Sequence, residues 1–381
     1  MSAELHMDLC FKHGELWEIR LIRANNEKRK LALRGRLDMI QVGIIGCGWA
    51  GQRHQQAVIN STQAELLAIA DKDKETLNLR RREWDTIHAY QDYKKMLKLE
   101  DLDAVVIALP HYLHKEATVQ SAEAGKHILC EKPIAITLDE ADAMIDAAQH
   151  NNVLLMIAES NRYNTLTMRI EELLREGAIG TAVTAEQNWF HKFERYGYKD
   201  RPWLNDPKRA RGGQWIINGV HQISVLRAWL KAAGAREAQQ IFAKEYRSPA
   251  FHTPKGIEAT VNAFLTFEHG QTAKVTMAVE VEHHNRFNGV RIYGTEGTLT
   301  ATGRPPLIAL YRDKAAEPEI ITLEEPAPSS FDIQMNHFVD CIESNAKPIT
   351  NGIEERNTLA VIVAGYDSMK TRKATYVDIR K

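Results

Sequence analysis

Apolar and polar positions follow two different rhythms along the chain. Up to about residue 158, short apolar runs typical of buried strands alternate with longer stretches typical of helices. Strands are expected at 40–45, 66–70, 104–109, 126–130 and 153–158, and helices at 52–59, at 114–124 and after Thr137. Repeated strand–helix units form a parallel sheet, and ligands of such sheets bind at the carboxyl ends of the strands. Residues 39–160 therefore predict an α/β domain with a doubly wound parallel sheet.

The second half of the chain is patterned differently. After a helix that ends near Gly177, a strand at 181–190 opens a region of two-residue alternation and turn signals. The runs 261–268 and 271–282 flank His269-Gly270 and predict a hairpin. We expect residues 161–381 to form a separate α+β domain with a large, mostly antiparallel open sheet.

Residues 1–38 precede the first clear strand. They lack the apolar core and small-residue cleavage site of a secretory signal, and a second methionine, Met39, stands directly before the strand. We expect this segment to be a loosely attached extension or the product of an upstream start, with a functional arm as the alternative.

Composition and charge narrow the class of partner. Lys and Arg total 49 against 50 Asp and Glu, so the formal net charge is -1 and gives no electrostatic reason to expect nucleic acid or an anionic membrane. No apolar run approaches the roughly 18 residues of a membrane span. The four cysteines are scattered and form no C-x-x-C pair, which favours a reduced, cytoplasmic protein with a small-molecule ligand.

A glycine-rich turn after the first strand indicates a dinucleotide site. Gly46 permits a tight turn, Gly48 lets the backbone approach a pyrophosphate, and Gly51 lets the following helix pack close to the strand. The next strand ends at Asp71, where a carboxylate would meet the adenosine ribose hydroxyls. Asp71 would repel a 2′-phosphate and favours NAD, although the neighbouring lysines keep NADP open. The alternative is an ordinary turn beside a solvated Asp.

These motifs, with others further along, resemble the glucose-fructose oxidoreductase, inositol dehydrogenase and MocA (Gfo/Idh/MocA) family over about residues 39–381. The resemblance implies a Rossmann domain followed by a domain that carries the substrate site and commonly a subunit interface. The motifs that carry it are 46–54, 108–114, 124–133, Asn161-Arg162-Tyr163, Gly212-Gly213, 218–221 and 294–297.

The resemblance also implies roles for individual residues. Lys132 would lie beside the nicotinamide and hydrogen-bond the reacting oxygen, where an ammonium stabilises a developing alkoxide. His221 would pass the proton, because imidazole titrates near neutral pH. The expected cofactor contacts are Gly46, Gly48, Trp49, Ala50, Gly51, Asp71, Leu109, Pro110, His111, His114, Glu131, Lys132 and Arg162. The expected substrate contacts are Tyr163, Trp203, Asn218 and His221.

One departure from the family pattern weakens the proton relay. Many relatives carry Asp one helical turn before this histidine and another three residues after it, whereas this chain has Ile217 and Ser224 there. Asn218 could orient His221 but cannot stabilise an imidazolium as a carboxylate would. Glu159 or Glu186 could supply a carboxylate from elsewhere, and sequence does not place them.

Two further features concern ligands. The loop 191–211 holds Phe193, Tyr196, Tyr198 and Trp203, which suit stacking on a sugar-like substrate but could equally pack on their own domain.

His111 and His114 are three residues apart and His283 and His284 are adjacent. Because no H-E-x-x-H or Cys/His quartet accompanies them, we predict no metal site.

The main hypothesis is an NAD(P)-dependent oxidoreductase that transfers hydride between nicotinamide and a secondary alcohol or ketone of a sugar, cyclitol or glycoside. By resemblance we expect a homo-oligomer, dimer or tetramer, formed through the open sheet. Three alternatives remain: a redox glycosidase that recycles NAD, a cis-dihydrodiol dehydrogenase, and a dinucleotide-sensing regulator without catalysis.

Overall fold

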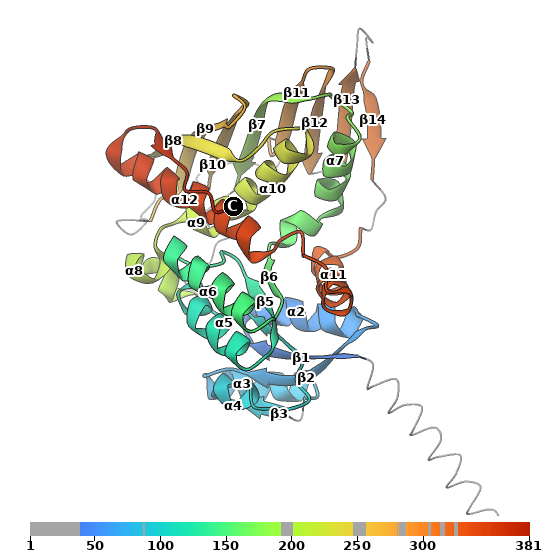
Figure 1. Cartoon of the computed structure of the whole chain (residues 1–381), viewed down its shortest axis with the longest axis vertical. Helices are drawn as coiled ribbons and strands as arrows, with labels where there is room; N and C mark the ends of the chain where they lie inside the picture. The colour runs from blue at the N-terminus through green and yellow to red at the C-terminus, as the bar shows by residue number, and fades with distance from the viewer. Residues whose placement is uncertain are drawn as a thin grey trace, which may run out of the picture.

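A computed structural model of the chain describes residues 39–86, 88–191, 201–246, 257–279, 281, 287–303, 306–312, 317–323 and 327–381. Two sheets dominate it, one in each half of the chain (Figure 1). Several expectations fall outside the described residues, namely those on the leader 1–38, on Phe193, Tyr196 and Tyr198, and on His283 and His284.

The first sheet has six strands in the order β3-β2-β1-β4-β5-β6, and every neighbouring pair is parallel. The strands are β1 (Ile40–Ile45), β2 (Ala64–Ala70), β3 (His88–Tyr90), β4 (Ala104–Ile107), β5 (His127–Glu131) and β6 (Leu155–Ala158). The helices are α2 (Trp49–Asn60), α3 (Lys74–Glu83), α4 (Tyr93–Met96), α5 (His114–Glu123) and α6 (Leu138–His150). This is the predicted doubly wound Rossmann architecture.

Local chemistry explains where these helices begin. The Thr137 side chain accepts a hydrogen bond from Glu140 N, and the Glu140 carboxylate accepts one from Ile136 N, so the start of α6 is capped from both sides. Asp73 caps α3 in the same manner. In contrast, α2 is preceded by Gly48, which offers no capping side chain. Its first N–H groups are therefore left for a ligand.

The second sheet has nine strands in the order β14-β13-β12-β11-β7-β10-β9-β8-β15. Its neighbouring strands are antiparallel except for β7 and β10, and β9 and β10 form the predicted hairpin around His269-Gly270. The strands are β7 (Ala182–Phe190), β8 (Ala238–Tyr246), β9 (Thr260–Phe267), β10 (Thr272–Ala278), β11 (Gly289–Gly294), β12 (Gly297–Gly303), β13 (Pro306–Arg312), β14 (Glu319–Thr322) and β15 (Thr375–Tyr376).

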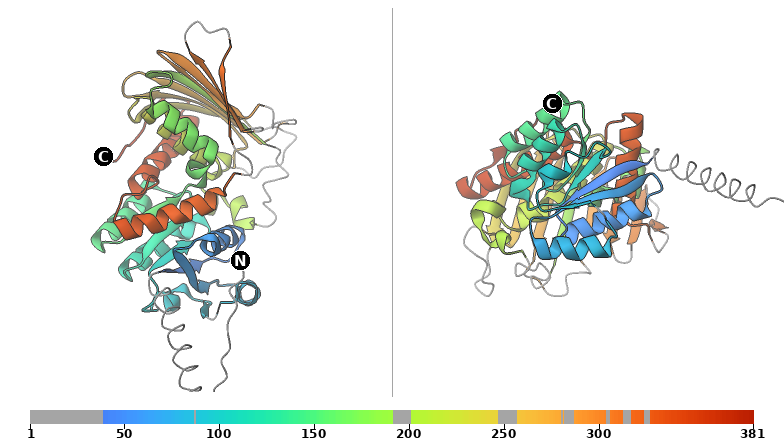
Figure 2. Two further views of the ribbon diagram at one scale, coloured as in Figure 1. Left: turned by 90° about the vertical axis from the view of Figure 1, so that its right-hand side faces the viewer. Right: turned by 90° about the horizontal axis from the view of Figure 1, so that it is seen from below.

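Helices cover one face of this second sheet, as Figure 2 shows for α7 (Thr165–Arg175) and α12 (Gly352–Thr371). Helix α10 (Gly219–Ala232) packs on β7 and on α12 and is buried along most of its length. The opposite face exposes large side chains on five strands, Val183, Phe242, Phe264, Tyr311 and Ile320. The sheet is thus open on one side.

Helix α11 (Ser330–Ser344) lies against α2 rather than on the second sheet (Figures 1 and 2). Its Met335, Phe338 and Val339 are fully buried in the same hydrophobic cluster as Val42 and Ile44 of β1. The core of the nucleotide-binding half therefore includes residues far beyond position 160. Among the described residues, no helix is long and apolar enough to cross a membrane.

Candidate active site

The glycine turn between β1 and α2 has the geometry of a phosphate-binding loop. Gly46 has a φ of +97°, and a Cβ there would lie 2.5 Å from the Ala108 carbonyl oxygen. A Cβ at Gly51 would lie 2.1 Å from the Gly46 carbonyl oxygen. Helix α2 can therefore approach the end of β1 this closely only because residue 51 has no side chain. A Cβ on Gly48 would meet no atom within 4 Å, so this residue borders open space.

Asp71 lies at the end of β2, next to this turn. One carboxylate oxygen accepts from Cys47 N at 2.8 Å and the other from Asp73 N at 2.9 Å. The side chain is thereby held in one orientation while each oxygen keeps a lone pair for a further donor. Open space at Gly48, free N–H groups at α2 and an oriented Asp71 together fit a dinucleotide with unmodified ribose hydroxyls.

The end of β5 carries a buried histidine–glutamate pair. Glu131 Oε1 lies 2.9 Å from His54 Nε2, the His54 side chain is 0% exposed, and the Glu131 side chain is 12% exposed. The Phe331 ring covers His54 edge-on at 5.1 Å, and it also contacts the exposed Trp49 ring. Although burial opposes it, hydrogen bonding and charge from His54, with the charge of Lys132, hold the pKa of Glu131 below its ordinary value. Glu131 is therefore a carboxylate anion, held in place by His54, directly before Lys132 in the chain.

Lys132 extends from the end of β5 toward the second half of the chain. Its Nζ donates to the Ile217 carbonyl oxygen at 2.8 Å. Burial lowers the pKa of Lys132 from its ordinary value, with Glu131 and Glu159 acting in the opposite direction and Arg201 adding to the lowering. A desolvated ammonium with a lowered pKa is a better hydrogen-bond and proton donor than a solvated one.

His221 is the second candidate reactive group and lies in the first turn of α10. Its Nδ1 is in close hydrogen-bond contact with Glu159 Oε1. Glu159 follows β6 directly and is fully buried, whereas the His221 side chain is 14% exposed. The carboxylate missing from positions 217 and 224 is therefore supplied by Glu159. The other candidate, Glu186, pairs instead with Arg291 at 3.4 Å on the exposed sheet.

A buried network holds the segment that receives Lys132. Helix α9 (Gln214–Ile217) is preceded by Gly213, where a Cβ would lie 2.1 Å from the Glu258 carbonyl oxygen. The Glu258 carboxylate accepts from Gly213 N, Trp215 N and Tyr366 Oη, each at 2.8 Å. Three donors on one carboxylate fix the backbone that presents the Ile217 carbonyl. Sequence reasoning missed Glu258, which no spacing connects to Gly213.

Aromatic rings lie over the turn after β4. The Trp203 ring of η4 (Pro202–Asn205) contacts the His111 ring edge-on at 4.7 Å, and His111 lies in η1 (His111–Leu113). Burial, with the charges of His114 and Lys132, lowers the pKa of His111 to about 3, so its ring is neutral. Leu109 and Pro110, which precede it, are half-buried. Trp203 is thus near the expected cofactor segment.

Four expected site residues point elsewhere. His114 is fully buried, and its ring nitrogens face the Pro133 and Leu109 carbonyls at 2.9 Å each, so it supports the site from behind. Arg162 is buried and pairs with Glu171 at 3.1 Å. Tyr163, expected to touch substrate, is 1% exposed and bonds Thr350 in the core. Asn218, expected to orient His221, donates its side-chain amide to Gln214.

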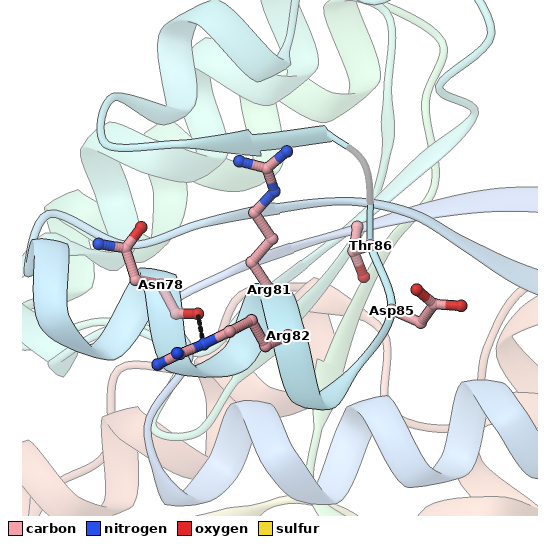
Figure 3. A pocket seen from close by; sticks show the side chains of 5 residues that line it. All are labelled: Asn78, Arg81, Arg82, Asp85 and Thr86. Carbon is pink, nitrogen blue, oxygen red and sulfur yellow. Dashed lines mark hydrogen bonds between the residues drawn. The ribbon is translucent and has the colours of Figure 1, made fainter.

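A surface cavity of about 670 Å³ lies at the C-terminal half of α3 and the turn that follows it. It is lined by Asn78, Arg81, Arg82, Asp85 and Thr86, and Figure 3 shows the two arginines extending to different sides of α3. Within the described ranges, no group of three or more His, Cys, Asp or Glu side chains could hold a metal ion.

Fold and site together define a dinucleotide-binding protein with a lysine and a histidine placed at the carboxyl edge of its parallel sheet. Residues 40–159 match the model of an oxidoreductase family with an NAD-binding Rossmann fold, and residues 167–300 match the GFO/IDH/MocA C-terminal domain. The chain belongs to the GFO/IDH/MocA family of oxidoreductases.

Individual relatives agree with this assignment. D-apiose dehydrogenase from Paraburkholderia graminis is 27% identical over 351 residues, which cover 88% of this chain and 89% of the relative. Levoglucosan dehydrogenase from Pseudarthrobacter phenanthrenivorans is 26% identical over 290 residues, covering 68% and 73%. Among solved structures, levoglucosan dehydrogenase in complex with NADH superposes with a TM-score of 0.80 at 21% identity, covering 90% of this chain and all of that one.

Proposed function

We propose that the protein oxidises a secondary alcohol, or reduces the corresponding ketone, on a sugar or cyclitol, with NAD as the preferred cofactor. Family membership makes it an NAD(P)-dependent oxidoreductase. The observation that carries the proposal is that Lys132 Nζ bonds the Ile217 carbonyl and lies within reach of the charge of Glu159, the carboxylate that contacts His221. When bound, the nicotinamide accepts or returns the hydride.

The side chains have distinct roles in this proposal. Lys132 donates a hydrogen bond to the substrate oxygen and stabilises negative charge on it as the C–H bond breaks. His221 removes the hydroxyl proton, and the resulting imidazolium is stabilised by the Glu159 carboxylate. The ring of Trp203 borders the substrate. Asp71 accepts hydrogen bonds from ribose hydroxyls and disfavours a 2′-phosphate, which supports NAD over NADP.

The test is reduction of NAD by the purified full chain with a panel of aldoses, anhydrosugars and inositols, followed at the NADH absorbance band. Lys132→Met should lower kcat by at least about 100-fold, because a neutral thioether cannot stabilise the developing alkoxide. The exposed Lys347→Met is the matched control and should behave as wild type. Full turnover by Lys132→Met would refute the role of this residue. Sugar release without net NADH would instead support a redox glycosidase.

We further propose that the protein is cytoplasmic and forms a homo-oligomer through the bare face of the second sheet. The apolar side chains Val183, Phe242, Phe264 and Tyr311 on that face support the second point, because large exposed apolar patches commonly mark interfaces. Sedimentation at micromolar concentration should give a multiple of the chain mass; a monomer would contradict the interface. Fractionation of the source cells would check the location.

A further inference from the structure

Two buried carboxylates lie behind His221. Glu159, at the end of β6, is 0% exposed, and Glu355, in the first turns of α12, is 4% exposed. The start of α12 is held beside β6 because Asn351 bridges Met156 and because Tyr163 bonds Thr350. Glu355 is consequently close enough to Glu159 to feel its charge.

The surroundings of the two carboxylates differ. Glu159 Oε1 contacts His221 Nδ1 and accepts from Asn161 N at 3.2 Å, whereas its Oε2 has no hydrogen-bond partner in the described part of the chain. Glu355 Oε1 accepts from Ser224 Oγ at 2.8 Å. Ser224 lies three residues after His221, on the same face of α10. The serine at the position of the missing family Asp therefore contacts a carboxylate from another helix.

The charged groups around this pair are already engaged. Arg162, from η2 (Ser160–Tyr163), pairs with Glu171, and Arg227 of α10 pairs with Glu237 and Glu354. Lys132 faces Glu159 and bonds the Ile217 carbonyl. Among the described residues, neither Glu159 nor Glu355 forms an ion pair with an arginine or a lysine. Two buried anions close together without an arginine or lysine partner are costly, and one proton relieves the repulsion.

The proton belongs on Glu355. Glu159 faces His221 and a backbone N–H, both of which stabilise its anion, while the Ser224 hydroxyl is the one hydrogen-bond donor to the Glu355 carboxylate among the residues that the structure describes. In agreement, burial and then the charge of Glu159 raise the pKa of Glu355 to about 7, against partial compensation from Arg162, Ser224 and Arg227.

We propose that Glu355 is a positioning residue that holds a proton and so keeps a single negative charge, on Glu159, behind His221. The inference rests on the proposed function of His221. With Glu159 ionised, Nδ1 of His221 must be the N–H donor, which leaves Nε2 free to accept the hydroxyl proton of the substrate. That proton passes from the substrate oxygen to Nε2 as hydride passes from the same carbon to the nicotinamide. Charge and mass balance without any movement of the Glu355 proton.

Raising the pH should change this arrangement. When Glu355 loses its proton, a second buried negative charge stands beside the Glu159–His221 pair. The rate of alcohol oxidation should therefore change with the ionisation of Glu355, near neutral pH.

Infrared spectroscopy of the full chain tests the proton directly and needs no substrate. Wild type should show the C=O stretching band of a buried carboxylic acid at about pH 6 and lose it by about pH 9. Glu355→Gln should lack this band. Glu354→Gln is the matched control, because Glu354 is paired with Lys231 and the pair helps to lower its pKa, so the band should remain. Because burial also raises the pKa of Glu258, the band is assigned from the difference between wild type and Glu355→Gln. Absence of the band in wild type, or no loss of its intensity in Glu355→Gln, would overturn the proposal.

Kinetics supply the functional readout. Glu355→Gln should keep kcat within about threefold at neutral pH and remove the ionisation near neutrality from the pH profile, whereas Glu159→Gln should lower kcat by about 10- to 100-fold. Ser224→Ala removes the donor to Glu355 and should move the infrared titration to higher pH. An unchanged profile in Glu355→Gln would contradict the positioning role. If the infrared result is as expected but no polyol is turned over, the proposal on the Glu159–Glu355 pair is supported and the proposed function alone is refuted.

Discussion

Among the described residues, two histidine–glutamate pairs lie near Lys132, and they differ in exposure. His54 and Glu131 are sealed beneath the Phe331 ring, with the His54 side chain 0% exposed. His221 and Glu159 have the opposite arrangement, because there the carboxylate is sealed and the imidazole is 14% exposed. The same two side chains can thus form a structural clamp or a reactive group, and which one they form depends on which partner is exposed.

The difference between the pairs has a physical basis. A fully enclosed imidazole cannot exchange protons with a substrate, so the His54–Glu131 pair only fixes Glu131 and the backbone that carries Lys132. An imidazole with one edge exposed and its other nitrogen on a buried anion can accept a proton and be stabilised afterwards. Three substitutions separate the two cases.

The largest effect is expected from His221→Asn. Asparagine keeps a hydrogen bond to Glu159 but cannot take up a proton, so kcat for alcohol oxidation should fall by about 100- to 10,000-fold while NADH affinity and the melting temperature stay near wild type. Stopped-flow absorbance and NADH fluorescence would measure this, with the exposed His150→Asn as control. If His221→Asn lowered the melting temperature as much as a core substitution does, His221 would have a structural role like that of His54.

An intermediate effect is expected from His54→Asn, and this effect is on the stability of the fold rather than on the rate. The Glu131 anion loses its partner, so the free energy of unfolding should fall by about 1–3 kcal/mol. Because the folded pKa of Glu131 lies below the ordinary 4.5, its stabilisation is present above that pH and is lost as the pH falls through the folded value. The difference in the free energy of unfolding between wild type and variant should therefore disappear in acid. Urea titrations at several pH values would show it, with exposed His88→Asn as control; a pH-independent gap would contradict the clamp.

The smallest effect is expected from Phe331→Ala, which uncovers His54 without touching the pair. The lost aromatic contacts should cost about 1 kcal/mol and lower the melting temperature by about 2–4 °C. Calorimetry beside Phe287→Ala, a residue that is 65% exposed, would measure the difference. If the two substitutions had equal effects, the ring would not be sealing the pair.

The location of this site followed from chain order, whereas the roles expected of Lys132 and His221 came from the family resemblance. The glycine turn, Asp71 and the segment around Lys132 all stand at the ends of strands, and a parallel sheet brings such ends to one edge. Strand and helix positions were predictable for the same reason, although α2 begins at Trp49 rather than at the expected Gln52.

What sequence could not supply was the pairing across elements. Glu159 and Glu186 both follow or lie in strands, and only the packing of α10 against the end of β6 decides that Glu159 meets His221. Glu355 is 131 positions from Ser224, so no periodicity connects them. Tyr163 was misplaced because its motif is shared with site residues while its ring turns into the core. Side-chain direction at the end of a strand depends on tertiary packing.

Helix α11 has a consequence for biosynthesis. Because Met335, Phe338 and Val339 complete the cluster around β1, the nucleotide-binding half cannot finish its core while the ribosome is still making the second sheet. Residues 39–160 should therefore emerge with this cluster incomplete, and the cluster should close only once the chain has reached α11. The cofactor half is for this reason a poor candidate for transplantation as an independent module.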